Sequence, residues 1–342
     1  MDGIQGDAFL IKTDGEGNEE WTRTYGATNS YDYCVSVDFA PGGGYYLGGQ
    51  RGSGPSSIDQ WVVRTDENGD EIWSNNYGTP GGGDGLAQVT AMQNGDCVFA
   101  SSWQTGSQFQ QQGCIVRLDP DGGVLWSQRY GPVANAVLHT VQELSPSNDL
   151  IVCGAYGMVG NQYFGALLRT TSTGDSLWMR FYQYHDSLVS NGRGLFRDVV
   201  PTPDGGFIVC GTALPVSHAD TLLYTQDVWV VKTDSMGCLE PGCHLITGME
   251  SQITNLKDVL RVWPNPVAQG GSVQLSIDLP ANFEPQGALR LSVVSSDGRL
   301  VQEQRLPSLT SPTSISALEA GLYHLHLSDD TRWISGTRLV VQ

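Results

Sequence analysis

The stretch GDAFLIKTDGEGNEEWTRTYG at residues 6–26 decides the fold, because it returns along the chain. It recurs as DQWVVRTDENGDEIWSNNYG (59–78), QGCIVRLDPDGGVLWSQRYG (112–131) and FGALLRTTSTGDSLWMRFY (164–182). Its opening returns once more as QDVWVVKTDSMG (226–237). A period of about 52 residues is typical of an array of similar units that bury their apolar faces against one another. The repeat therefore favours a scaffold or a binding surface over a single-core enzyme.

Each copy contains the same apolar run, turn and aromatic pair. The apolar runs (FLI, WVV, CIV, ALL and WVV) lack a polar face, as strands buried on both sides do. An Asp-x-x-Gly step follows, in which Asp can bond its own backbone and Gly tolerates a positive φ. A Trp and then a Tyr come after the turn, so each copy predicts a β-hairpin. The repeat positions are Asp14, Gly17, Trp21, Asp66, Gly69, Trp73, Asp119, Gly122, Trp126, Gly174 and Trp178.

A second hairpin pattern lies between the first ones, as PGGGYYLGG, QNGDCVFAS, PSNDLIVCG and PDGGFIVCG. Two hairpins per period make four strands, and four-stranded blades stacked face to face bury both faces of every strand. The sequence thus predicts an all-β fold with a β-propeller of about 4–5 blades over residues 1–233. A column of small residues favours close packing of the blades: Gly48, Ala100, Cys153 and Cys210. A solenoid is the main alternative, but its coils are usually shorter than this period.

The chain opens in the middle of a predicted blade, and Met1 precedes no charged and apolar leader. We therefore expect a chain cut short at its N-terminus, with its signal peptide lost. The alternative is a small propeller that closes its ring by joining residues 6–26 to the terminal strands.

Composition favours an extracellular protein and excludes some partners. Charged residues make up 16% of the chain, the net charge is −18, and Lys occurs three times. Seven acidic and six basic residues after position 259 leave that segment near −1, so the preceding part carries about −17. Nucleic acids and anionic membranes require basic patches, so neither is an expected partner. No apolar run is long enough to span a bilayer.

The seven cysteines are an odd number, so at least one is unpaired within the chain. Cys153 and Cys210 lie in the small-residue column and are expected to be core residues. Cys238 and Cys243 flank a short loop with Pro and Gly after the last repeat strand, which predicts a disulfide between them. A metal site there would need more ligands than the adjacent His244, so we expect no metal.

The character of the sequence changes toward the C-terminus. Residues 234–259 contain the Cys-bearing loop and a linker, and residues 260–342 contain six or seven short apolar or alternating segments. The Asp297-Gly298 pair marks a hairpin turn. This pattern predicts a small β-sandwich that forms its own domain.

Ordered motifs in this last segment resemble a known family. They are Pro264-Asn265-Pro266, Asp297-Gly298, Gly321 with Tyr323, and the terminal Leu339-Val340-Val341. In this order at the extreme C-terminus, they are similar to the C-terminal sorting domain of type IX secretion cargo in Bacteroidota. Family members usually end in a basic residue, whereas this chain ends in Gln342.

The resemblance implies a route and a location. It implies export across the inner membrane by a signal peptide, recognition of the tail by the type IX machinery, and passage across the outer membrane. Cleavage of the tail and release, or anchoring to surface lipopolysaccharide, are further implications. The protein would then be secreted or lie on the outer-membrane surface.

The function of the passenger remains open between three classes. A non-catalytic binding, adhesion or scaffold protein, with a surface glycan or protein as ligand and without cofactor or catalytic residues, is the favoured prediction. A quinoprotein-like enzyme is an alternative because LDPDGGVLW resembles the blade signature of that family, but the chain has no Cys-Cys pair. A glycosidase would need two convergent carboxylates. The polar residues that depart from the repeat are Glu143, Asp186, Asp198, Asp220, His139, His185 and His218.

Overall fold

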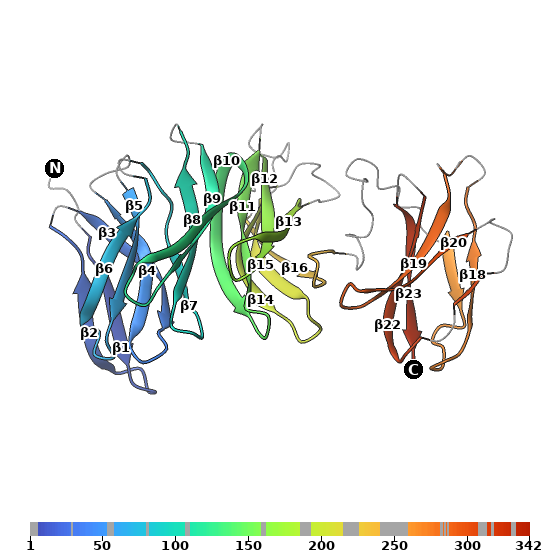
Figure 1. Cartoon of the computed structure of the whole chain (residues 1–342), viewed down its shortest axis with the longest axis horizontal. Helices are drawn as coiled ribbons and strands as arrows, with labels where there is room; N and C mark the ends of the chain where they lie inside the picture. The colour runs from blue at the N-terminus through green and yellow to red at the C-terminus, as the bar shows by residue number, and fades with distance from the viewer. Residues whose placement is uncertain are drawn as a thin grey trace. The chain divides into compact units, whose positions relative to one another are not determined.

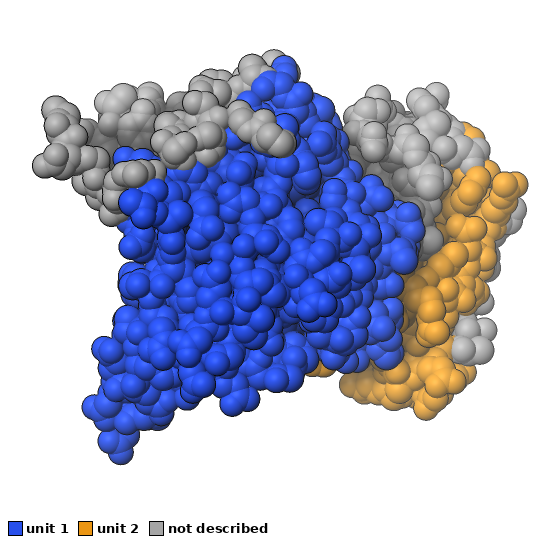
Figure 2. All heavy atoms as spheres, turned by 60° about the vertical axis from the view of Figure 1, so that its left-hand side comes forward, with its two compact units in different colours: residues 1–200, 209–230 blue, residues 201–208, 231–342 orange. Residues whose placement is uncertain are grey.

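We analysed a computed structural model of the chain (Figure 1). It describes residues 6–28, 30–52, 58–79, 82–106, 110–158, 162–184, 193–214, 226–239, 259–280, 283, 285, 287–306, 313–315, 318–329 and 333–342. Within these ranges the protein is all-β, with open antiparallel sheets and no helix. The chain divides into two compact units, residues 1–200 with 209–230 and residues 201–208 with 231–342, which Figure 2 colours separately.

The first unit begins with a hairpin and a four-stranded sheet. The hairpin pairs β1 (Ala8–Thr13) with β2 (Glu19–Tyr25). The sheet has the order β3-β4-β5-β6, with strands β3 (Tyr31–Phe39), β4 (Tyr45–Gly52), β5 (Ile58–Thr65) and β6 (Glu71–Tyr77). One sequence period therefore forms four antiparallel strands in chain order, as the two hairpin patterns predict.

The following periods form a seven-stranded sheet, because one long strand belongs to two of them. Its members are β7 (Gln88–Ala91), β8 (Cys97–Gln104), β9 (Gln111–Leu118), β10 (Val124–Leu144), β11 (Asp149–Met158), β12 (Gln162–Thr170) and β13 (Ser176–Tyr182). The first part of β10 pairs with β9 and the second part with β11. The sequence predicts a break after Tyr130, but the chain stays extended there and shifts its register instead.

A three-stranded sheet ends the repeats, with β14 (Arg193–Pro201), β15 (Phe207–Leu214) and β16 (Asp227–Thr233). Among the described strands, β1 and β2 pair only with each other, so no ladder joins them to β14–β16. The sequence leaves open whether residues 6–26 pair with the terminal strands and so close a ring. No ladder among the described strands makes this pairing. Whether the sheets belong to a propeller stays a prediction.

The repeated Asp residues shape the hairpin turns. The Asp14 carboxylate accepts hydrogen bonds from the backbone N–H groups of Glu16 and Asn18, both at 2.9 Å. The side-chain bond from Asn18 is the main reason that the pKa of Asp14 is lowered. Equivalent bonds occur at Asp66 and Asp119, and the turn glycines have φ values between +73° and +88°. A positive φ is disfavoured for residues with a Cβ, which explains the glycine.

The Trp and Tyr of one copy contact the turn glycine of the next copy. The Tyr25 hydroxyl donates to the Gly69 carbonyl at 2.6 Å, and a Cβ on Gly69 would lie 2.7 Å from the Trp21 ring. Tyr77 and Tyr130 bond the next turn glycines in the same way at 2.8 and 2.7 Å. The four Trp residues of the repeat also lie opposite the basic residue of their own hairpin, in the pairs Lys12↔Trp21, Arg64↔Trp73, Arg117↔Trp126 and Arg169↔Trp178.

The C-terminal part of the second unit contains two sheets around one apolar cluster. The first has the order β17-β18-β21 and the second β20-β19-β22-β23. Their strands are β17 (Leu260–Trp263), β18 (Val273–Ile277), β19 (Leu289–Ser295), β20 (Leu300–Leu306), β21 (Thr313–Ile315), β22 (Gly321–Ser328) and β23 (Trp333–Val341). Leu260 and Val273 of one sheet and Leu291, Leu325 and Leu339 of the other share the cluster, and each is almost fully buried.

Two glycine substitutions should separate backbone strain from packing in the repeat turns. Gly17 and Gly174 both have φ +88°, but a Cβ on Gly17 would meet nothing within 4 Å. A Cβ on Gly174 would lie 3.0 Å from the Trp126 ring. We expect Gly174→Ala to lower the free energy of unfolding by about 1 kcal/mol more than Gly17→Ala does. Urea unfolding followed by tryptophan fluorescence measures both, and equal losses would contradict the packing role of the turn.

Candidate functional site

The Pro264-Asn265-Pro266 motif holds the terminal strand of the chain. The Asn265 side-chain amide donates to the Arg338 carbonyl at 2.7 Å, and its oxygen accepts from the Val340 N–H at 3.0 Å. Val267 then exchanges two backbone hydrogen bonds with the same strand, to the Val340 carbonyl and from the Gln342 N–H. Two predicted motifs that lie far apart in the sequence thus meet in one contact.

The other predicted residues of the terminal motif lie in the same sheet. Leu339 pairs with Tyr323 and is fully buried, Val341 pairs with Gly321, and Val340 is partly exposed. Tyr323 is buried, and its hydroxyl donates to the Glu319 carbonyl at 3.0 Å. Gly321 is the first residue of β22, and its pairing with Val341 belongs to the ladder between β22 and β23.

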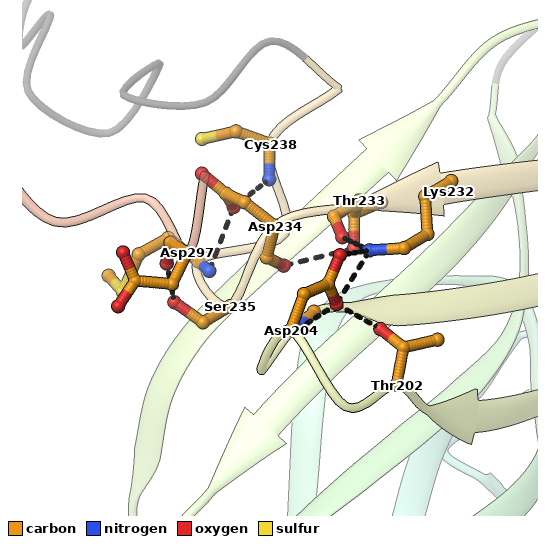
Figure 3. A network of polar contacts seen from close by, with 10 residues as sticks. Thr202, Asp204, Lys232, Thr233, Asp234, Ser235, Cys238 and Asp297 are labelled. Carbon is orange, nitrogen blue, oxygen red and sulfur yellow. Dashed lines mark hydrogen bonds and ion pairs between the residues drawn. The ribbon is translucent and has the colours of Figure 1, made fainter. Parts of the chain in front are cut away.

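The predicted Asp297-Gly298 turn contacts a turn of the repeat type. The Asp234 carboxylate accepts from the backbone N–H groups of Met236 and Cys238, both at 2.8 Å, as Asp14 does in the first hairpin. The Ser235 hydroxyl donates to the Asp297 backbone carbonyl (Figure 3). Gly298 has φ +86°, and a Cβ there would lie 2.5 Å from the Asp234 carboxylate. No motif in the sequence indicates this contact.

The cysteines differ in their environments. Cys238 is buried and disulfide-bonded, while Cys243 lies outside the described residues, so the pairing of these two stays a prediction. The free thiols in the described part are Cys34, Cys97, Cys114, Cys153 and Cys210. Burial raises the pKa of the Cys34 and Cys114 thiols to about 12. Cys153 is a core residue as predicted, but Cys210 is exposed, because no further sheet covers its side of β15 in the described part.

Polar side chains join equivalent strands of successive sequence periods. Ser36 on β3 accepts from the Val89 N–H at 2.9 Å, and Asp38 accepts from the Ala91 N–H at 2.8 Å. The Thr90 hydroxyl of β7 donates to the Val141 carbonyl of β10 at 2.6 Å. These side chains therefore satisfy backbone groups between successive periods of the repeat.

His139 occupies the centre of this row and is nearly buried. Its Nε2 lies 2.9 Å from an Arg197 nitrogen, and its Nδ1 lies 2.9 Å from the Gln88 side-chain amide nitrogen. Arginine can only donate, so Nε2 accepts and Nδ1 carries the proton. A Gln88 amide turned by 180°, with its oxygen toward the ring, then accepts from Nδ1. Burial, and secondarily the Arg197 charge, lower the pKa of His139 to about 4. A neutral, doubly hydrogen-bonded ring is a structural element rather than a general base.

In the described part, each of the two carboxylates that depart from the repeat accepts a backbone hydrogen bond. Glu143 accepts from the Gln93 N–H at 3.0 Å, and Asp198 accepts from the Val199 N–H at 2.9 Å. The remaining candidates, Asp186, Asp220, His185 and His218, lie outside the described residues. The described residues contain no group of three His, Cys, Asp or Glu side chains that could hold a metal ion. They also contain no helix long and apolar enough to cross a membrane.

A groove of about 380 Å³ lies between successive outer strands of the first unit. Buried Val116 contributes to the lining of the groove. Asp59 and Asn76 also line it, and the Asn76 amide donates to the Asp59 carboxylate at 3.2 Å. The Trp103 ring also lines it, and the Arg129 guanidinium lies 4.8 Å from the centre of that ring. Its size and its mixture of aromatic and polar groups fit a small-molecule site. No pattern in the sequence indicates this groove, because its residues come from three hairpins.

Comparisons with known proteins assign the C-terminal segment. The family model described as "Secretion system C-terminal sorting domain" matches residues 261–342. The match supports a cargo protein of the type IX secretion system, and hence a secreted or cell-surface protein. A search of curated proteins found no match.

Several solved structures are similar to this chain at low identity. A mannose phosphorylase from Leishmania mexicana, MPT-4, in complex with phosphate is 11% identical over 99% of this chain and 89% of that chain, with a TM-score of 0.36. A sucrose-6-phosphate hydrolase from Lactobacillus gasseri is 10% identical over 91% and 74%, with a TM-score of 0.34. Drosophila Plexin A in complex with Semaphorin 1b is 11% identical over 94% and 51%, with a TM-score of 0.32. At these low TM-scores the similarities carry no argument.

Removal of the Asn265 side chain should loosen the terminal strand. Asn265→Ala deletes both hydrogen bonds to β23, and each is worth about 1 kcal/mol. We expect the Val340 amide to exchange with deuterium at least about tenfold faster, because local opening becomes easier. Asn265→Asp retains the acceptor for Val340 and should have a smaller effect. Unchanged exchange at Val340 in the alanine variant would show that the motif does not hold the strand.

Acidification should destabilise the first unit through His139. Its pKa is lower in the folded protein, about 4, than the ordinary value of 6.5, so the unfolded chain binds more protons between these values. Stability should therefore fall as pH falls from about 6.5 to 4, by at most about 3 kcal/mol from this group. NMR titration of the His139 ring measures the pKa directly. A pKa above 6 for His139 would contradict the buried neutral ring. The variant His139→Gln should lose less unfolding free energy than the unchanged protein when the pH falls from about 6.5 to 4.

Proposed function

We propose that this protein is a type IX secretion cargo of a bacterium of the Bacteroidota. In this proposal residues 260–342 form a β-sandwich that directs export, residues 1–233 form a β-propeller passenger, and residues 234–259 connect them. The observation that carries the proposal is the contact of Asn265 with Arg338 and Val340, because it joins two sorting motifs at the very end of the chain. The family match over residues 261–342 supports the same assignment.

The repeats are proposed to be a non-catalytic binding passenger. In the described part, the repeated Asp, Trp and Tyr side chains are engaged in turns and in contacts between sheets, as at Asp14 and Tyr25. His139 is neutral and held between Gln88 and Arg197, which leaves no free base at that position. The groove beside Trp103 is a candidate ligand site, and its Asp59–Asn76 pair suits the hydroxyl groups of a neutral glycan.

An export assay tests the proposal. The full chain with a signal peptide is expressed in a Bacteroidota host, and a second form lacks residues 337–342. We expect the full chain to reach the cell surface and the shortened form to accumulate in the periplasm, because the deletion removes buried Leu339 and Val341 together with the partner of Asn265.

A double variant separates export from folding. Arg338 is exposed and Val340 is partly exposed, so Arg338→Glu with Val340→Glu changes the surface of β23 and leaves its buried residues in place. Periplasmic accumulation of a folded double variant would mean that the type IX machinery recognises the exposed surface of β23. Equal export of the full chain and the form without residues 337–342 would overturn the sorting assignment.

A further inference from the structure

One position of the repeat decides whether the space between two outer hairpins is filled or open. Arg51, Trp103 and Tyr156 occupy this position in successive copies, each three residues after the small residue of its second strand. They keep the same register to the third strand of their sheets: Arg51↔Asp59, Trp103↔Gln112 and Tyr156↔Phe164. Arg51 is held by the Asp32 carboxylate at 3.3 Å, so the informative comparison is between the two aromatic residues.

Tyr156 fills the space beside it. It is fully buried, and its hydroxyl donates to the Tyr130 carbonyl at 2.6 Å. The three atoms nearest to a Cβ on Gly131 would all belong to the Tyr156 ring and hydroxyl. On its other side, the centre of the Phe181 ring lies 5.3 Å from the centre of the Tyr156 ring. The phenol thus occupies the space between two successive outer hairpins.

Trp103 leaves the equivalent space open. Its indole N–H donates to the Thr79 hydroxyl, which holds the ring toward the loop after β6. Gly78 is the equivalent of Gly131, but the three atoms nearest to a Cβ on Gly78 would belong to Asp84. Gly78 therefore lines the groove of about 380 Å³, whereas Gly131 is covered by an aromatic ring.

The groove offers a polar side and an apolar side. The Asn76 amide donates to Oδ2 of Asp59, and within the described residues Oδ1 accepts no hydrogen bond. The Ser127 hydroxyl also lines the groove. The Val116 and Val124 side chains and the Trp103 ring form the apolar side. A pyranose can use both sides, because it presents hydroxyl groups at its edge and C–H groups on its faces.

The charges at the groove favour a neutral ligand. Asp59 brings one negative charge, and the Arg129 guanidinium, 4.8 Å from the centre of the Trp103 ring, brings one positive charge. An anionic ligand would be attracted by Arg129 and repelled by Asp59, and a cationic ligand the reverse. With one charge of each sign, neither gains a net attraction.

We propose that the groove binds one neutral hexopyranose residue of a glycan, with a sugar hydroxyl in the place that corresponds to the Tyr156 phenol. This hydroxyl donates to the Tyr77 carbonyl, as Tyr156 donates to the equivalent Tyr130. A second hydroxyl donates to Oδ1 of Asp59, and the C–H groups of the sugar contact Val116 and the Trp103 ring. The inference rests on the proposed role of the repeats as a binding passenger and names the ligand class of that role.

Saturation-transfer NMR with the full chain tests the ligand class. The probes are methyl α-D-mannopyranoside, methyl β-D-glucopyranoside and methyl β-D-galactopyranoside, and the corresponding methyl uronides are the charged controls. We expect saturable binding of at least one neutral glycoside at about millimolar concentration, because a small ligand at a single open site makes few contacts. The corresponding uronide should bind at least about tenfold more weakly, because its carboxylate meets Asp59.

Matched variants locate the binding. Trp103→Tyr should fill the groove, because tyrosine at the equivalent position does so in the next copy. Asp59→Ala removes the acceptor for the second hydroxyl. We expect at least about tenfold weaker binding for both variants. Asp227 is the exposed equivalent of Asp59 in the last copy, so Asp227→Ala should leave binding unchanged.

Three results would overturn the proposal. They are no saturable binding of any of the three glycosides, undiminished binding by a folded Trp103→Tyr or Asp59→Ala variant, and tighter binding of a uronide than of its neutral counterpart. Thermal unfolding shows whether each variant is folded. Both groove variants should still reach the surface of a Bacteroidota host, so absent sugar binding with normal export contradicts this inference and not the export proposal.

Discussion

The repeats depend on the contact between a turn glycine and the Trp–Tyr pair of the preceding hairpin. The glycine must adopt a positive φ to close its own turn, and it must lack a Cβ to admit the Trp ring. Its carbonyl also accepts the Tyr hydroxyl, as Gly174 does from Tyr130. The positive φ and the absence of a Cβ explain why glycine persists at this place, since any residue could supply the carbonyl. The Asp of the turn only has to accept hydrogen bonds from the backbone. Thr171 replaces it in one copy, and its hydroxyl accepts from the Asp175 N–H.

The hairpins could be predicted from the sequence because their causes are local. An apolar run, an Asp-x-x-Gly turn and a Trp lie within about 15 residues, and each is sufficient for its part of the hairpin. The bond from the Tyr25 hydroxyl to the Gly69 carbonyl spans 44 residues and needs the relative placement of two sheets. The spacing of residues in the sequence does not show how two sheets lie relative to each other. The continuity of β10 was missed for a related reason, since Gly131 and Pro132 usually interrupt a strand.

At the candidate sites, too, local motifs could be predicted from the sequence, whereas contacts between distant residues could not. The Pro264-Asn265-Pro266 motif and the terminal Leu339–Val341 strand were recognised as separate motifs, but nothing in the sequence joins Asn265 to Val340 across 75 residues. His139 was recognised as a departure from the repeat, but the sequence names no partner for it. The structure gives it Gln88 and Arg197, which lie one period away on either side. Contacts between residues far apart in the sequence, such as those of His139 and Asn265, are thus the part that the sequence predicts least.

The same repeat also limits which partners the first unit can bind. Basic residues are scarce, and the basic column of the hairpins is used within the sheets: Arg117 pairs with Asp96 at 2.6 Å and Arg169 with Asp149 at 2.7 Å. Arg51 is held by the buried Asp32 carboxylate and lies 4.0 Å from the centre of the Trp61 ring. Since these cations are already paired, the excess of acidic side chains dominates the remaining surface. A ligand of the repeats should therefore be neutral or cationic, because a polyanion would meet repulsion without compensating contacts.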